Sequence, residues 1–232
     1  MTEIVASVLP FRTYEELKNK IASLRSVVSV IQIDFCDGRY VPSQTWPFTS
    51  GGFEDYDFQK IMNEEQGLPF WEEFDFEFDL MVADAVENFD IYMRLGPKRM
   101  IFHLEAMENL EDFRNFLEGI DLYIRDSIEF GIAFKPSTPL ENVFSVVPLI
   151  DFVQCMGNDK IGISGIALDE KTYSIIKSIR DKYPDLPIEV DIGITEETAP
   201  LLVDAGATKL VTGSVLFNSH DKIGFVERFS NL

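Results

Sequence analysis

The most constraining feature of the sequence is a regular alternation of short apolar runs with longer segments of helical pattern. The runs are rich in β-branched and aromatic residues, which is typical of strands buried in a sheet. Strands that alternate with helices predict βα units and a parallel sheet. The predicted strands span residues 4–9, 30–35, 76–81, 99–104, 131–135, 149–155, 187–191 and 209–213.

The segments between these runs carry helix signals. Thr13, followed three residues later by Glu16, has the spacing of a capping box and predicts the start of a first helix. Further helices are predicted at residues 85–93, 110–130, 140–146, 169–182 and 196–205. Eight strands with intervening helices in 232 residues match the number and size of a (β/α)8 TIM barrel, which we expect to form one domain over residues 1–232. A doubly wound sheet is the alternative, but it seldom needs eight evenly spaced units.

The charge of the chain excludes several classes of partner. There are 40 acidic and 20 basic residues, so the formal net charge is −20. We therefore expect no binding to a nucleic-acid backbone, which needs a basic face, and no binding to an anionic membrane surface. No apolar stretch approaches the ~20 residues of a membrane helix, and the first residues lack the basic region of a signal peptide. A cytoplasmic protein that binds a small molecule is the expectation.

Residues 43–75 interrupt the alternation and are too long for an ordinary βα connection. The segment is rich in acidic and aromatic residues, among them Trp46 and Trp71. It predicts one helix at residues 58–66, ended by Gly67 with Pro69 beyond it. Two interpretations stay open for the rest of the segment. It is either a satellite core or a contact between copies of the chain, or it is a lid over the mouth of the barrel.

Three aspartates stand inside or at the end of apolar strands: Asp34 in the second predicted strand, Asp79 in the third and Asp191 in the seventh. Burying a carboxylate is costly unless a metal, a partner or a function compensates it. A barrel brings these strands around one axis, so the three carboxylates are expected to converge at one end.

Glycines form a second set, because they follow the last three predicted strands. The backbone N–H groups of Gly165, Gly193, Gly213 and Ser214 are expected to converge on a phosphate, as in the recurrent phosphate site of such barrels. Each glycine alone indicates only a tight turn.

These residues belong to longer motifs that resemble the ribulose-phosphate 3-epimerases. Residues 188–217, IEVDIGITEETAPLLVDAGATKLVTGSVLF, resemble the family pattern EVDGG…ETAP…AGA…V.GS.IF without a gap. GISG at 162–165 resembles the family's GFGG loop, and IDFCDGRYVPS at 33–43 resembles VDVMDGHFVPN. FKPSTPLE at 134–141, HLEA at 103–106 and ASVL at 6–9 resemble NPATPLE, HVEA and PSIL. The resemblance covers most of the chain outside residues 43–75.

The resemblance implies an isomerase of carbohydrate metabolism, in the pentose phosphate pathway. In that family two aspartates on opposite faces of a ketopentose phosphate exchange the C3 proton, and a divalent metal stabilises the cis-enediolate. The resemblance places the acid and the base at Asp34 and Asp191. The substrate and phosphate-binding set that it implies is Ser7, Gly162, Ser164, Gly165, Gly193, Gly213 and Ser214.

The sequence departs from the family at the metal, which the family holds with His, Asp, His, Asp. Gln32 replaces the first histidine and Asp79 replaces the second, so the implied ligands are Gln32, Asp34, Asp79 and Asp191. Oxygen donors of this kind favour Mg²⁺ or Mn²⁺ over Zn²⁺. The alternative is that the site has lost its metal, in which case the carboxylates repel one another and at least one pKa rises.

Other departures concern the phosphate loops and two isolated side chains. Ser164 occupies a glycine position in GISG, and Ile192 stands in the middle of DIG where the family has DGG. Cys36 stands where the family has a methionine, and a buried apolar thiol is expected there. His103 is expected to make a structural hydrogen bond.

The sequence therefore favours an epimerase acting on a ketose phosphate by proton transfer between two aspartates. A second interpretation is a related barrel lyase or decarboxylase, but such a site usually has a lysine, and none is present beside Leu80 and Met81. A third is a degenerate, non-catalytic barrel that binds a phosphorylated ligand or a protein partner.

Overall fold

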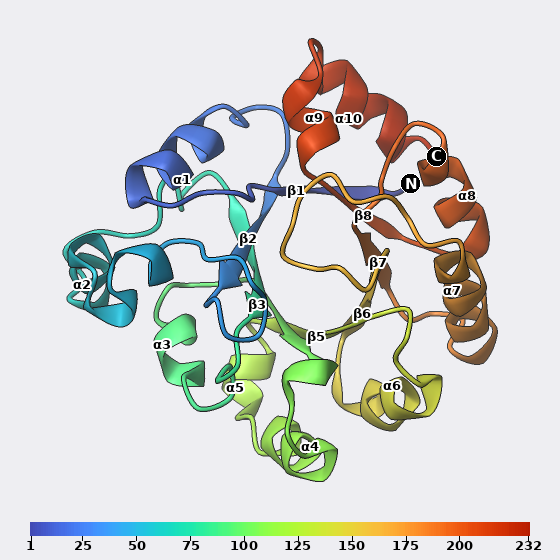
Figure 1. Cartoon of the computed structure of the whole chain (residues 1–232), viewed down its shortest axis with the longest axis horizontal. Coiled ribbons are helices and arrows are strands. Elements are labelled where there is room, and N and C mark those ends of the chain that lie inside the picture. The colour runs from blue at the N-terminus through green and yellow to red at the C-terminus, as the bar shows by residue number, and fades with distance from the viewer.

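The computed structural model describes residues 1–232 and shows a closed barrel of eight parallel strands in the order β1 to β8. Figure 1 looks along the barrel, with the strands around the centre and the helices outside them. The predicted TIM barrel is thus confirmed. The strands are β1 Glu3–Ser7, β2 Val30–Cys36, β3 Asp75–Met81, β4 Arg99–His103, β5 Glu129–Phe134, β6 Phe152–Met156, β7 Ile188–Asp191 and β8 Lys209–Thr212.

Ten α-helices and four short 3₁₀ turns connect and cover the strands. The helices are α1 Tyr14–Ala22, α2 Tyr56–Met62, α3 Phe89–Met93, α4 Leu110–Glu118, α5 Leu122–Arg125, α6 Leu140–Val146, α7 Lys171–Lys182, α8 Thr198–Ala205, α9 Ser214–Asn218 and α10 Lys222–Ser230. Thr13 caps α1 as predicted, because its hydroxyl accepts a hydrogen bond from the N–H of Glu16. No helix has the length and apolar character that a membrane crossing requires.

The prediction of one helix over residues 110–130 is wrong. Helix α4 ends at Gly119, and α5 begins after Asp121, whose carboxylate accepts a hydrogen bond from the N–H of Tyr123. Strand β5 starts at Glu129, because that end of the segment pairs with β4. A pattern of apolar residues alone did not reveal the break, although Gly119 is a residue that commonly ends helices.

The predicted helix at residues 58–66 is displaced toward the N-terminus. Asp55 caps α2 by accepting from the N–H of Phe58, so the helix begins at Tyr56. It stops at Asn63, because Glu64 takes a left-handed conformation with φ 62°. Gly67 and Pro69 therefore lie beyond the end of the helix and do not terminate it.

Most of residues 43–75 pack on the outside of the barrel, between α1 and α3, where Figure 1 places α2. Trp46 is buried and its ring contacts Tyr14 and Phe58 edge to face or tilted, at centroid distances of 5.3 and 5.8 Å. Its indole N–H donates to Asp55 at 2.8 Å. The segment thus buries its aromatic residues in a satellite of the main core, which favours the packing interpretation over the lid.

The alternation of side chains along each strand divides the core into two parts. One face of each strand packs against the helices, in a large apolar cluster that includes Phe35, Phe78 and Phe102. The other face points into the barrel, so residues two apart on a strand lie one above the other along its axis. Asp79 and Glu77 on β3, and Asp191 and Glu189 on β7, are pairs of this kind.

Candidate active site

Asp34, Asp79 and Asp191 meet inside the barrel, at the end where the strands finish. Asp34 and Asp79 lie side by side in the register of β2 and β3, and Asp191 ends β7. Ligand oxygens of all three lie within 4.8 Å of one another. Asp34 and Asp79 are buried and Asp191 is half-buried. The fold therefore concentrates three carboxylates in a volume that excludes most water.

Neighbouring side chains hold Asp34 in place. The hydroxyl of Ser7 on β1 donates to Oδ2 at 2.6 Å, and the amide nitrogen of Gln32 donates to Oδ1 at 2.8 Å. Burial and the nearby Asp79 nevertheless raise the pKa of Asp34 to about 7. The charged form of this carboxylate is thus costly, even with both oxygens hydrogen bonded.

Asp191 is perturbed in the same direction. Burial raises its pKa well above the usual value, and the charges of Asp34 and Asp79 add to the rise. The backbone N–H of Ile192 donates to Asp191 Oδ1 at 2.8 Å and partly opposes this shift. Raised pKa values of this kind are common among carboxyl groups that act as acid and base catalysts.

Asp79 lies deeper and both its oxygens have partners. His103 Nε2 is 2.6 Å from Oδ1, and the amide nitrogen of Gln154 donates to Oδ2 at 3.0 Å. The expected structural hydrogen bond of His103 is therefore present. The sequence interpretation missed Gln154, although a polar residue in the apolar run LIDFVQC is the same signal that singled out Asp34.

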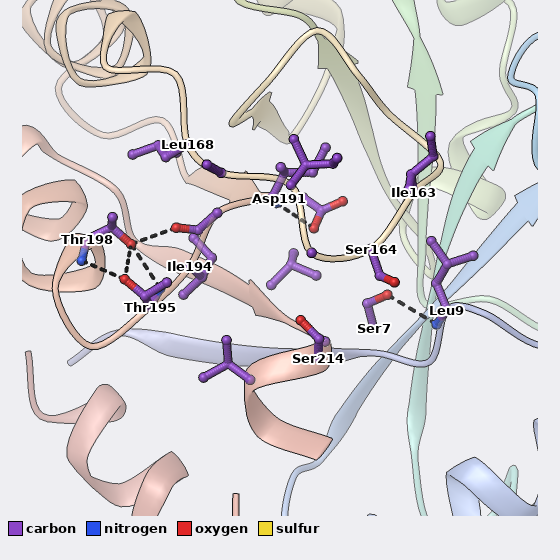
Figure 2. A pocket seen from close by; sticks show the side chains of 18 of the residues that line it. Ser7, Leu9, Ile163, Ser164, Leu168, Asp191, Ile194, Thr195, Thr198 and Ser214 are labelled. Carbon is purple, nitrogen blue, oxygen red and sulfur yellow. Dashed lines mark hydrogen bonds between the residues drawn. The ribbon is translucent and has the colours of Figure 1, made fainter. Parts of the chain in front are cut away.

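A cavity of about 650 Å³ opens at this end of the barrel. Asp34 and Asp191 line it, whereas Asp79 and Gln32 do not. In the view of Figure 2, Asp191 lies above the bend of the loop that carries Ser164, and Ser7 and Ser214, at the start of α9, lie below it. All the expected substrate and phosphate-binding residues line the same cavity: Ser7, Gly162, Ser164, Gly165, Gly193, Gly213 and Ser214.

The cavity has no basic side chain in its lining. Its polar donors are backbone amides and the hydroxyls of residues such as Ser164 and Ser214, since the hydroxyl of Ser7 donates to Asp34. Gly165 and Gly193 take positive φ values of 79°, a conformation that few other residues adopt readily, and this shapes the loops after β6 and β7. An anion in this cavity would therefore depend on loop amides for its hydrogen bonds.

Comparison with known proteins decides the family. The sequence profile of the Ribulose-phosphate 3 epimerase family matches residues 3–217. The chain belongs to this family. The ribulose-phosphate 3-epimerase of Eremothecium gossypii is 30% identical over 147 residues, which are 63% of this chain and 59% of that protein. The one of Chlamydia pneumoniae is 30% identical over 195 residues, 82% of this chain and 76% of that protein.

The solved structures agree on the architecture. A structure of KGPDC from Streptococcus mutans superimposes with a TM-score of 0.69 at 12% identity, over 99% of this chain and 96% of that one. At this identity the likeness shows the fold alone. The profile match confirms both the resemblance seen in the motifs and the prediction of an isomerase that acts on a carbohydrate.

This member of the epimerase family departs from the family pattern at the residues that would hold the metal, where Gln32 and Asp79 replace two histidines. Gln32 lies two residues before Asp34 on the inner face of β2. Its amide nitrogen is taken by Asp34, but its Oε1 is buried without a hydrogen-bond partner. Three clustered carboxylates and one unpartnered amide oxygen form a donor set that fits a hard divalent cation.

Cys36 lies next to this epimerase-family site but does not line its cavity. The side chain is buried, and burial together with Asp34 and Asp79 raises the pKa of the thiol well above its usual value. A protonated, enclosed thiol is a poor nucleophile. The expectation of an apolar cysteine at this position is consistent with that environment.

Proposed function

We propose that this protein epimerises a ketopentose phosphate at C3, with Asp34 and Asp191 as the two proton-transfer groups. The observation that carries the proposal is that these two carboxylates, from strands on different sides of the barrel, both reach one cavity and have oxygens within 4.8 Å of each other. Inverting a carbon requires a base on one face and an acid on the other.

The protonation states support this exchange. With a pKa of about 7, Asp34 is present in both forms at neutral pH, and Asp191 is also shifted upward. In one direction the ionised carboxylate removes the C3 proton, and the electron pair moves into the adjacent carbonyl. The other carboxyl group then delivers its proton to the opposite face of C3, which restores the ketone. Each turnover leaves the two groups with exchanged protonation states.

The other end of the substrate would lie against the loops after β6, β7 and β8. Gly165, Gly193, Ser214 and Ser164 line the cavity, and their backbone amides and the Ser164 hydroxyl can donate hydrogen bonds to a phosphate, whereas the Ser7 hydroxyl donates to Asp34. Because no basic side chain lines the cavity, the phosphate is held mainly by backbone N–H groups. The orientation of these groups is set by the loops, so they fix the position of C3 relative to the two aspartates.

Asp34, Asp79 and Asp191, with Gln32, would hold a divalent cation, and we infer Mg²⁺ or Mn²⁺ from the oxygen donors. When bound, the cation supplies positive charge that stabilises the negative charge developing on the substrate oxygens. His103 and Gln154 orient Asp79 from behind, as hydrogen-bond partners of metal-binding carboxylates do elsewhere.

The test is proton exchange at C3 of D-ribulose 5-phosphate in D₂O, followed by NMR, with Mn²⁺ added and with a chelator. We expect deuterium at C3 and formation of the 3-epimer with the wild type. Asp34→Asn and Asp191→Asn should each lose at least about 10²–10⁴-fold in rate. Asp75→Asn is the control, because Asp75 is exposed at the start of β3, away from the cavity.

The other outcomes separate the alternatives. Binding of the phosphosugar without exchange, with or without metal, would indicate a non-catalytic barrel. Release of a carbon fragment instead of epimerisation would indicate a lyase. The structure does not favour the lyase, because no lysine is among the residues that line the cavity.

A further inference from the structure

His103 orients Asp79 although the imidazole itself has a single hydrogen bond. The ring is fully buried at the end of β4, and Nε2 is 2.6 Å from Asp79 Oδ1. The other ring nitrogen, Nδ1, is buried without a hydrogen-bond partner. Rotation about χ2 is only weakly restricted in histidine, so one hydrogen bond does not fix the ring. Another contact must hold it.

The lack of a partner at Nδ1 also indicates where the ring proton lies. A proton on Nδ1 would be a buried donor without an acceptor, which is costly, whereas a proton on Nε2 is donated to the carboxylate. Nε2–H therefore donates to Asp79. A half-turn of the ring would place a carbon where Nε2 now lies. The orientation of His103 thus decides whether Asp79 receives this hydrogen bond.

Tyr40 supplies the contact that holds the ring of His103. The two ring centroids are 5.3 Å apart and the ring planes are tilted by 53°, a favourable arrangement of aromatic side chains. Tyr40 lies in the loop after β2 and is half-buried against an apolar cluster that includes Met81 and Ala133. It does not line the cavity, so any effect it has on the site passes through its neighbours.

Glu105 holds Tyr40 in turn. The hydroxyl of Tyr40 donates to Glu105 Oε2 at 3.1 Å. Glu105 Oε1 accepts from the N–H of Lys135 at 2.9 Å and from the hydroxyl of Thr138. Burial and the charge of Glu105 raise the pKa of Tyr40, so its hydroxyl remains a donor. Hydrogen bonds thus join the loops after β2, β4 and β5 at Tyr40.

The ring and the hydroxyl of Tyr40 have separate origins in the sequence. The family motif VDVMDGHFVPN has phenylalanine where this chain, in IDFCDGRYVPS, has Tyr40. The aromatic ring is therefore common to the motif, and the hydroxyl is a feature of this chain. We expect the ring to provide the positioning contact and the hydroxyl to add a tether.

We propose that Tyr40 is a positioning residue whose ring holds the imidazole of His103 with Nε2–H directed at Asp79, and that this contact sets the affinity of the carboxylate cluster for a divalent cation. The effect passes from Tyr40 through His103 to Asp79. The part of the inference that concerns the cation rests on the proposed function, because it takes Asp79 as a ligand. The part that concerns the orientation of His103 does not.

NMR of the histidine ring nitrogens tests the orientation without metal or substrate. The chain has two histidines, and the exposed His220 serves as an internal control. We expect His103 in the wild type and in Tyr40→Phe to be a single Nε2–H tautomer with a slowly exchanging proton. Tyr40→Leu should give mixed tautomers and faster proton exchange. A wild type with the proton on Nδ1, or a His103 signal unchanged in Tyr40→Leu, would overturn the proposal.

Calorimetric titration with Mn²⁺ tests the link to the cation. Loss of a group that orients a metal ligand typically lowers metal affinity by 10–100-fold. We expect Tyr40→Leu to raise the Kd for Mn²⁺ by about 10-fold, and Tyr40→Phe to restore a value close to that of the wild type. Tyr56→Leu is the matched control, because Tyr56 is 72% exposed at the start of α2. An unchanged Kd in Tyr40→Leu would overturn the effect on the cation.

A double-mutant cycle separates positioning from general loosening of the fold. In the His103→Asn background, Tyr40→Leu should add no further loss of Mn²⁺ affinity, because its effect passes through the imidazole. Additive losses would overturn this route. If Tyr40→Leu does not fold, Tyr40→Met takes its place, since methionine fills irregular apolar space without an aromatic ring.

Failure of the proposed function has a different signature. A wild type that binds no Mn²⁺ would reject the divalent cation there and overturn the part of this inference that concerns it. The NMR spectra of His103 in wild type and variants would then decide the orientation alone.

Discussion

The two ends of the barrel interior differ in the basic side chains that accompany their buried acids. At the end where the strands begin, Glu77 and Glu189 are fully buried but have basic neighbours on adjacent strands. Arg99 contacts Glu77 at 3.4 Å, and its register places it beside that residue on β3. At the other end, the cavity has Asp34 and Asp191 in its wall and no basic side chain. We call Glu77 and Glu189 the base cluster, and Asp34, Asp79 and Asp191 the mouth cluster.

The comparison is direct because the same strands supply both clusters. Strand β3 provides Glu77 and Asp79, and β7 provides Glu189 and Asp191, in each case two residues apart on the inner face. At the base, Glu77 has Arg99 as an ion-pair partner and Glu189 lies beside Lys209 in the register of β7 and β8. The cavity at the mouth has no basic side chain in its lining, which is the arrangement expected where a cation, a substrate or a transferred proton completes the balance.

Removal of Arg99 should break the base cluster and gives the largest expected effect on stability. Arg99 also contacts Glu3 and Glu129, at 2.9 and 3.0 Å, so Arg99→Met leaves Glu77 buried without its closest cation. Breaking a buried ion pair by removing one partner costs about 3–5 kcal/mol where the acid is ionised, and burial and Glu189 raise the pKa of Glu77, so the full loss is expected at high pH. We expect that loss in urea unfolding, with exchange per folded molecule unchanged. Arg228→Met is the control, because its pair with Glu196 is exposed and contributes little.

The mouth cluster should show its uncompensated charge in the pH dependence of stability, measured in the presence of a chelator. A carboxyl whose pKa is raised on folding binds its proton more tightly when folded. Its contribution is therefore fully present below the unfolded pKa of 3.8 and is lost as pH rises through about 7. For Asp34 a shift of this size corresponds to at most about 4 kcal/mol.

Asp34→Asn isolates that contribution from those of other buried acids. Burial raises the pKa of Glu77, and the neighbouring Glu189 adds to the rise, so the base cluster also weakens as pH increases. We expect a smaller loss of unfolding free energy between pH 4 and pH 8 in the variant than in the wild type. Equal slopes of unfolding free energy against pH in the two proteins would mean that folding does not raise the pKa of Asp34.

The sequence was sufficient for the fold because each strand carries its own signal. The eight apolar runs became eight strands, with boundaries that moved by a few residues. Local breaks were less visible: Gly119 divides the segment predicted as one helix, and capping by Asp55 moves another. Such boundaries depend on single hydrogen bonds and not on the repeat of apolar residues.

The residues of the candidate site also fall into those that the sequence alone revealed and those that it did not. Asp34, Asp79 and Asp191 stood out because a carboxylate in an apolar strand is anomalous by itself. Gln154 was missed because an amide is a weaker anomaly, and the partnership of Arg99 with Glu77 depends on strand register. The contact of Tyr40 with His103 had no signal, because it joins loops that follow different strands. Contacts between residues distant in sequence therefore required the closed barrel.

Addition of a divalent cation should sharpen the contrast between the clusters. We expect Mn²⁺ or Mg²⁺ to raise the melting temperature of the wild type, because an ion that binds only the folded state stabilises it, by about 2.7 kcal/mol at 100 times its Kd. Asp79→Asn should lose most of this increase, since it removes one anionic ligand. Asp75→Asn on the same strand should keep it. A full response in Asp79→Asn would make that residue a hydrogen-bond partner of His103 and Gln154 only.

The smallest expected effect is a change in the tryptophan fluorescence of residues 43–75 on ligand binding. It tests whether binding changes the structure beyond the mouth of the barrel. Trp46 is 1% exposed and packed behind the barrel wall, Trp71 is 61% exposed, and neither lines the cavity. We therefore expect saturating D-ribulose 5-phosphate to leave the indole emission maximum unchanged. Trp71→Phe isolates the signal of Trp46 and should behave in the same way.

One contact makes this fluorescence test a demanding one. The hydroxyl of Ser43 donates to the carbonyl of Gly162, so the segment is tied to the loop that carries Ser164 into the cavity. If that loop moves onto a bound sugar, the movement has a path to Trp46 three residues further along the chain. A ligand-dependent shift that disappears in Ser43→Ala would show that the segment takes part in closure, and the lid interpretation would replace the packing one. A shift that persists in Ser43→Ala would place the movement elsewhere in the segment and would equally reject simple packing.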